Sequence, residues 1–97
     1  MSVASFQIDD GAADTVKVSG ALVFATAAAA LTAIREALSR PGKLRLDLAG
    51  VQSSDSAGLA CVLAALAGSR EHVVVNSVPA GMLALAQVCE VDRLLAV

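Results

Sequence analysis

This 97-residue chain contains no tryptophan and no tyrosine, and its aromatic side chains are two phenylalanines, Phe6 and Phe24. Proteins that bind single-stranded nucleic acid stack the bases on aromatic rings, so the composition argues against that activity. Seven lysines and arginines stand against nine acidic residues, for a net charge of −2. Because no basic stripe is available to contact phosphates, we expect no nucleic acid among the partners of this chain.

The sequence is equally poor in groups that carry out catalysis. Its single histidine, His72, opens an expected strand, where a surface role is far more common than that of a general base. The chain has no HExxH motif, no His/Cys cluster and no phosphate-binding loop of the Gly-x-x-x-x-Gly-Lys type. We therefore expect no catalytic residue, no metal and no cofactor, and nothing supports a small enzyme or a nucleotide-binding protein.

Long apolar runs are also missing. The best candidate, residues 21–34, holds fourteen residues with two threonines, against roughly twenty needed to cross a bilayer. The start of the chain lacks the basic segment and apolar block of a signal peptide, so we expect a cytoplasmic protein. The two cysteines, Cys61 and Cys89, fall on apolar faces of expected helices without CxxC spacing, and we expect both thiols to be buried.

Hydrophobic residues make up 57% of the chain, above the roughly 45–50% of typical soluble proteins, and much of the excess is alanine. The length suits one domain around a single core. Periodicity predicts a hairpin followed by alternating helices and strands. The expected strands are 5–9, 15–19, 43–48, 72–76 and 94–97, and the expected helices are 26–40, 59–67 and 79–89.

Strands separated by helices pair in parallel through right-handed crossovers. We therefore predict an α/β fold with a mixed, mostly parallel sheet, an N-terminal hairpin and helices packed mainly on one face. The expected core includes Leu46, Leu48, Leu59, Leu63, Val74 and Leu85. Near the hairpin, Asp9, Asp10 and Asp14 form a solvated turn or, alternatively, contact a cation.

The most informative segment, residues 47–59, reads DLAGVQSSDSAGL. An alternating strand runs into a polar turn, which leads directly into an apolar helix. The N–H groups in the first turn of a helix have no intrahelical partners and carry partial positive charge. Small side chains there let a partner or an anion approach the backbone. Asp55 or Ser56 is expected to cap this helix.

This segment resembles the signature of the STAS domain family, the anti-sigma-factor antagonists and their relatives, in which an apolar strand and an Asp precede Asp-Ser-Ser/Thr-Gly-Leu. Residues 19–26 and 78–95 are also similar to that family. These flanking segments and the small Ala57 look most like the MlaB-type branch, the small cytoplasmic subunit attached to the ATPase of the Mla phospholipid-transport machine. The resemblance implies one STAS domain over residues 1–97.

The resemblance implies a non-catalytic interaction or regulatory subunit that binds the ATPase of a phospholipid-transport ABC system and meets the membrane only through that complex. Ser56 is implied as a contact residue and as a possible phosphorylation site. The contact surface also includes the segment 21–25. The implied partner-binding residues are Asp55, Ser56, Ala57, Gly58, Leu59, Ala60 and Ala64.

The alternative is an anti-sigma-factor antagonist that binds an anti-sigma kinase and is switched by phosphorylation. In that branch the acceptor is the second residue after the Asp, and here that position is Ala57, which has no hydroxyl. The acidic residues that many antagonists carry in a Gly-Glu-Leu-Asp stretch are replaced by Ala21 and Val23. The pattern leaves open whether Val23 belongs to the core or to an apolar contact surface.

Overall fold

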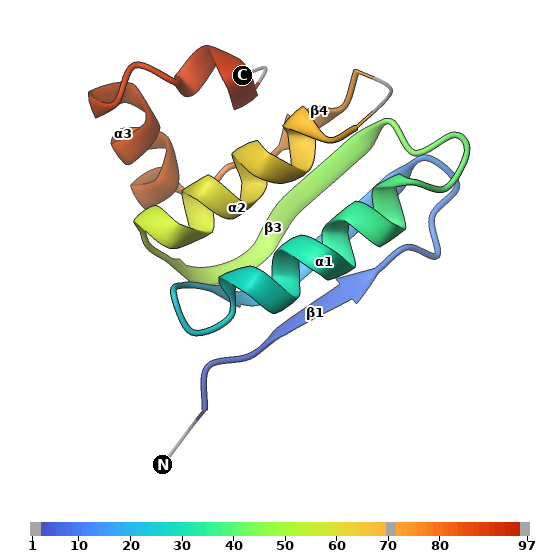
Figure 1. Ribbon diagram of the computed structural model, residues 1–97, viewed down its shortest axis with the longest axis horizontal. Coiled ribbons are helices and arrows are strands. Elements are labelled where there is room, and N and C mark those ends of the chain that lie inside the picture. Colours follow the sequence, from blue (N-terminus) through green and yellow to red (C-terminus); the bar gives the residue numbers. More distant parts are fainter. Residues whose placement is uncertain (1–2, 70–71, 96–97) are drawn as a thin grey trace.

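The computed structural model describes residues 3–69 and 72–95, and within them four strands form one sheet in the order β1-β2-β3-β4 (Figure 1). Strand β1 pairs antiparallel with β2, whereas the pairs β2–β3 and β3–β4 are parallel. The predicted α/β class and the mixed, mostly parallel sheet with an N-terminal hairpin are therefore confirmed. The strands are β1 (Phe6–Asp9), β2 (Thr15–Leu22), β3 (Arg45–Ser54) and β4 (Val74–Asn76).

Helices α1 and α2 lie side by side on one face of the sheet, and α3 packs beside α2 (Figure 1). Both crossovers, β2–α1–β3 and β3–α2–β4, advance in the same direction across the sheet. Right-handed crossovers of this kind bring their helices to the same face. The helical elements are α1 (Ala27–Leu38), α2 (Ser56–Ala67), α3 (Ala80–Val88) and the 3₁₀ helix η1 (Asp92–Leu95).

The core lies between the sheet and the helices. Leu46, Leu48 and Leu59 are buried in it as predicted, and Leu63 and Leu85 are half-buried against it. The prediction for Val74 is wrong, because Val73 and Val75 are the buried residues at β4. Since side chains alternate along a strand, Val74 points to the opposite face.

Strands β2 and β3 continue beyond their predicted ends. The segment after Leu48, expected as a polar turn, is instead paired with β2 as far as Ser54, opposite Leu22. Gly20 makes an irregularity in β2 possible: its φ is +89°, and a Cβ there would lie 2.4 Å from the carbonyl oxygen of Ser5. Backbone pairing therefore holds residues whose side chains show no strand pattern.

The C-terminal segment differs from the prediction. Helix α3 ends at Val88, and Glu90 adopts a left-handed φ of 60°. The N–H of Val91 then donates to the carbonyl of Ala86, a pattern that closes a helix and turns the chain away. Cys89, at the cap, is exposed, so its predicted burial is wrong, whereas Cys61 is buried as predicted.

The predicted final strand is also wrong over residues 94–95, which belong to η1; residues 96–97 lie outside the described part of the chain. Leu95 is fully buried, and it reaches the core through a 3₁₀ turn. A short apolar run does not distinguish a strand from a helical turn.

The acidic residues near the hairpin are used within the fold. Asp10 pairs with Arg40, and a carboxylate oxygen of Asp14 lies 3.5 Å from Arg45 Nε. Asp9 Oδ1 accepts a hydrogen bond from the N–H of Gly11 at 2.9 Å. These contacts fit a closed turn better than the alternative cation contact.

Candidate functional site

The loops that follow β2, β3 and β4 gather at one edge of the sheet, just before α1, α2 and α3 (Figure 1). The carboxyl ends of parallel strands are a common place for binding sites in α/β proteins. Two segments predicted to belong to the contact surface, residues 21–25 and the loop 55–59, meet here. The backbone N–H of Asp55 donates to the carbonyl of Leu22 at 3.3 Å.

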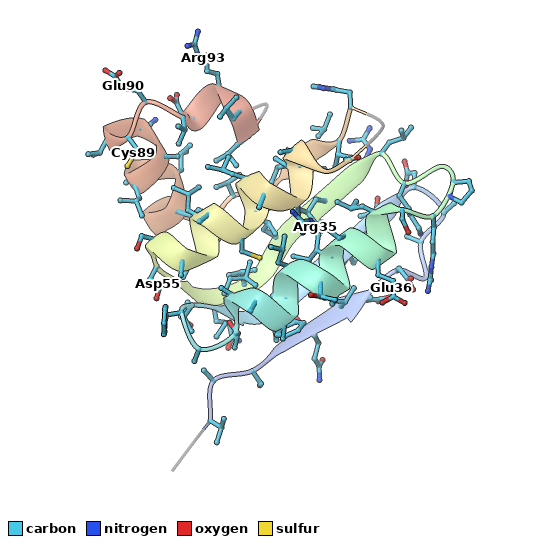
Figure 2. The ribbon with its side chains drawn as sticks, in the orientation of Figure 1. Arg35, Glu36, Asp55, Cys89, Glu90 and Arg93 are labelled. Carbon is cyan, nitrogen blue, oxygen red and sulfur yellow. The ribbon has the colours of Figure 1, made fainter. Side chains whose placement is uncertain are left out.

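Asp55 is the residue that caps α2, which decides between the two predicted candidates, Asp55 and Ser56. Its Oδ1 accepts from the N–H of Gly58 at 3.0 Å. Its Oδ2 accepts from the N–H of Phe24, also at 3.0 Å, across 31 residues of sequence. One carboxylate at the start of α2 (Figure 2) therefore joins two loops that are distant in the sequence.

Hydrogen bonds from the N–H of Phe24 and, secondly, of Gly58 lower the pKa of Asp55 below its ordinary value. Its side chain is therefore ionised at neutral pH. Among the residues that the structure describes, no basic side chain forms an ion pair with it. The edge of the sheet thus presents one fixed negative charge.

Gly58 and Leu59, both predicted to contact a partner, are buried. A Cβ on Gly58 would lie 1.9 Å from the carbonyl oxygen of Leu22, so α2 approaches the end of β2 more closely than any side chain permits. Leu59 packs into the core. These two residues support the surface from beneath, and their predicted direct contact is corrected accordingly.

The remaining predicted residues form the outer surface. Ser56 and Ala60 are exposed, and Ala57 and Ala64 are half-buried. Because residues four apart share a helix face, Ser56, Ala60 and Ala64 form one row along α2. We call Asp55, Ser56, Ala57, Ala60 and Ala64 the α2 surface.

The sequence places Phe24 within the predicted contact segment 21–25 but does not single it out. The residue is 86% exposed, and it lies in the loop that Asp55 joins to α2. The available signal was its chemistry: it is one of two aromatic residues, in a segment without strand or helix periodicity. Val23, left open between core and surface, is half-buried.

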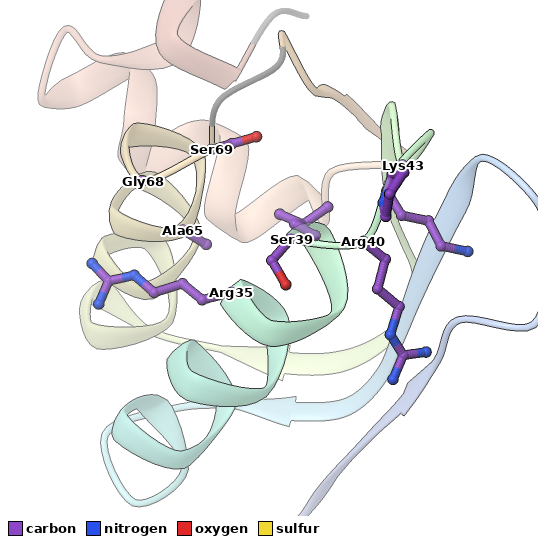
Figure 3. Close-up of a pocket in the computed structure, with 9 residues that line it drawn as sticks. Arg35, Ser39, Arg40, Lys43, Ala65, Gly68 and Ser69 are labelled. Carbon is purple, nitrogen blue, oxygen red and sulfur yellow. The ribbon is translucent and has the colours of Figure 1, made fainter.

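A cavity of about 410 Å³ lies away from this edge, against the end of α1 and the end of α2. Three basic residues line it, but Lys43 donates to the carbonyls of Asp10 and Ala12, and Arg40 pairs with Asp10. Figure 3 shows that Arg35 and Arg40 extend in different directions. The three cations therefore do not converge on a common ligand position.

Within residues 3–69 and 72–95, no three His, Cys, Asp or Glu side chains are placed to hold a metal ion. None of the helices described there combines the length and the apolar character that a bilayer crossing requires.

Comparison with solved structures finds the anti-sigma factor antagonist SpoIIAA in its unphosphorylated form, with a TM-score of 0.66 and 16% sequence identity. The alignment covers 92% of this chain and 84% of that chain. At this identity the likeness concerns the fold. A comparison with curated proteins gave no significant match. The model of the family described as "Mlab, STAS domain" matches residues 6–96. The chain therefore belongs to the MlaB-type STAS domain family.

Proposed function

We propose that this chain is a non-catalytic interaction subunit that binds the cytoplasmic ATPase of an Mla-type phospholipid-transport ABC system. The observation that carries the proposal is the α2 surface. It consists of small residues beside Asp55, is exposed at Asp55, Ser56 and Ala60, and is held in place by Asp55 at the edge where the loops of the sheet meet. Family membership supports the type of partner, and the proposal places the protein in the cytoplasm.

The shape of the α2 surface is better suited to binding a protein than to catalysis. Ala57, Ala60 and Ala64 carry only methyl groups, so a partner helix approaches the backbone of α2 without displacing long side chains. Ser56 has the one side-chain hydroxyl of this surface and is exposed. It is a contact residue and the proposed position for regulation.

The second candidate function is that of an anti-sigma-factor antagonist. It is favoured by the SpoIIAA-like fold and by the exposure of Ser56. A phosphate on Ser56 would add about two negative charges beside the ionised Asp55, and like charges at the contact surface would oppose binding. Ala57, at the usual acceptor position of that branch, weighs against this candidate.

The test is binding of the purified chain to the purified ATPase. We expect Ser56→Glu and Ala64→Arg each to weaken binding at least about tenfold, the equivalent of about 1.4 kcal/mol. The melting temperature of Ser56→Glu should hardly change, because a carboxylate near a helix N-terminus is tolerated, and the melting temperature of Ala64→Arg, at a half-buried position, is measured alongside. Ala13→Glu and Ala13→Arg place the same groups on the exposed hairpin turn, and they should bind like wild type.

Two outcomes separate the candidates. If wild type binds a kinase-type anti-sigma factor and not the ATPase, the second candidate replaces the first. If both α2 variants fold normally and bind the ATPase as tightly as wild type does, the partner site lies elsewhere on the molecule.

A further inference from the structure

Phe24 presents a large apolar side chain to solvent at the edge of the sheet, with 86% of the residue exposed. The remaining aromatic residue, Phe6, is half-buried against the core. Single exposed apolar residues are common on protein surfaces, so exposure alone has little meaning. The exposure of Phe24 is informative because hydrogen bonds hold its backbone in a fixed position.

The side chain of Thr26 holds the loop around Phe24 together from the inside. Thr26 is only 5% exposed. Thr26 Oγ1 accepts from the N–H of Val23 at 3.0 Å and lies 2.8 Å from the carbonyl oxygen of Ala21, to which it donates. The N–H groups of Thr26 and Ala27 both donate to the carbonyl of Val23 at 2.9 Å. The loop therefore has its own hydrogen-bonded frame.

Asp55 then fixes this frame against α2. Its carboxylate accepts from the N–H of Phe24 with one oxygen and from the N–H of Gly58 with the other. The ring of Phe24 is thus carried on a backbone whose position is tied to the α2 surface. An aromatic side chain on a fixed backbone loses little conformational freedom on binding, and such residues dominate the energetics of many interfaces.

We propose that Phe24 is the aromatic anchor of the partner surface and that Asp55 is the residue that positions it. The occupant is a protein that offers an apolar pocket to the ring while its neighbouring surface covers α2. Phe24 lies beside the negatively charged Asp55, in a chain of net charge −2. An anionic lipid surface would repel both the carboxylate of Asp55 and the net negative charge of the chain. The inference rests on the proposed function, because it takes the α2 surface as the partner site.

The first test titrates variants of the full chain against the purified ATPase. We expect Phe24→Ala to weaken binding about thirtyfold, the equivalent of about 2 kcal/mol, without lowering the melting temperature. Phe24→Leu keeps an apolar anchor and should recover most of the affinity. Val88→Ala is the matched control, because Val88 is 80% exposed on α3; it should bind like wild type.

The second test isolates the positioning role of Asp55. Asp55→Ser keeps an oxygen that caps α2 by accepting from the N–H of Gly58. This single oxygen cannot also accept the hydrogen bond from the N–H of Phe24. We expect the Phe24 amide hydrogen to exchange faster in this variant, while protection along α2 is retained. Binding should weaken about tenfold, and by less than about threefold when Phe24 is already alanine. Fully additive losses would overturn the positioning role.

The same variants are also titrated against a kinase-type anti-sigma factor and against phosphatidylglycerol vesicles. These titrations separate a failure of the proposed function from a failure of the inference about Phe24. If the kinase binds in place of the ATPase and Phe24→Ala weakens that complex, the proposed function fails and this inference stands. If either protein binds wild type and Phe24→Ala equally well, the inference fails. If neither protein binds wild type, both fail. Vesicle binding that disappears in Phe24→Ala would identify a lipid contact and overturn the protein anchor.

Discussion

At the scale of single residues, Asp55 has two roles, and the sequence reveals one of them. An Asp before an apolar helix predicts a cap, and Asp55 caps α2. Its second bond joins it to Phe24 across 31 residues. No local pattern predicts such a bond, because it depends on the loops after β2 and β3 meeting at one edge of the sheet.

The carboxylate of Asp55 should make stability depend on pH. Its pKa is lowered in the folded state, so its contribution is complete above the unfolded pKa of about 3.9. The contribution is lost as the pH falls through the lower, folded-state pKa. Urea unfolding of wild type and Asp55→Ser should therefore show a stability difference that is constant from pH 7 to 5 and shrinks below about pH 4. A difference unchanged down to pH 2 would contradict this.

The two thiols should differ in reactivity. Burial raises the pKa of Cys61, against a smaller opposing effect of Arg35, whereas Cys89 is exposed. Because the thiolate is the reactive form, an aromatic disulfide reagent at pH 8 should modify one thiol per native chain rapidly and the second only after unfolding. The rapid phase should disappear in Cys89→Ser. Two rapid thiols in native wild type would show that Cys61 is accessible.

At the scale of elements, the contact between α2 and the end of β2 depends on Gly58. The N-terminal turn of α2 packs directly on the carbonyl of Leu22, with room for a hydrogen atom and not for a methyl group. The same approach brings the N–H of Asp55 to that carbonyl. The glycine of the Asp-Ser-Ala-Gly-Leu segment is therefore needed to place the α2 surface beside the Phe24 loop.

Two identical substitutions should have opposite effects. Gly58→Ala places a methyl group 1.9 Å from backbone oxygen, and we expect it to destabilise the fold by more than about 2 kcal/mol. Gly81→Ala, in α3, meets nothing within 4 Å and should stabilise by about 0.5–1 kcal/mol. Urea unfolding measures both. Equal stability of Gly58→Ala and wild type would contradict the close packing of α2 on β2.

The accuracy of the predicted elements follows the strength of their side-chain patterns. Helix α1 was predictable because its apolar residues recur at helical spacing and Pro41-Gly42 follows its end. The second half of β3, from Ala49 to Ser54, was not, because it consists mainly of small and polar residues, four of which are exposed. Pairing of its backbone with β2 holds it instead. The exposure of Cys89 depends on the left-handed turn at Glu90. The sequence does not indicate this turn, because the residue is not a glycine.

At the scale of the whole molecule, Lys43 ties the turn of the hairpin to the loop between α1 and β3. It is 7% exposed, and its ammonium group donates to the carbonyls of Asp10 and Ala12. Lys43→Met preserves most of the volume and removes these bonds. We expect a loss of about 1–2 kcal/mol in the free energy of unfolding. Lys17→Met, on an exposed position of β2, should stay within about 0.5 kcal/mol of wild type. A smaller loss for Lys43→Met than for Lys17→Met would contradict this role.

The order of strands in the sheet is the order in which the ribosome makes them. Each new strand joins an edge that already exists, and none has to be inserted between two earlier ones. The hairpin and the β2–α1–β3 unit are thus able to pair during synthesis. Met82 and Leu95, both buried, are made late, so the core beneath α2 closes only as translation passes residue 95. A released chain that ends between Asn76 and Met82 would therefore contain all four strands of the sheet but lack most of α3 and all of η1, with apolar surface on α2 left uncovered for a chaperone.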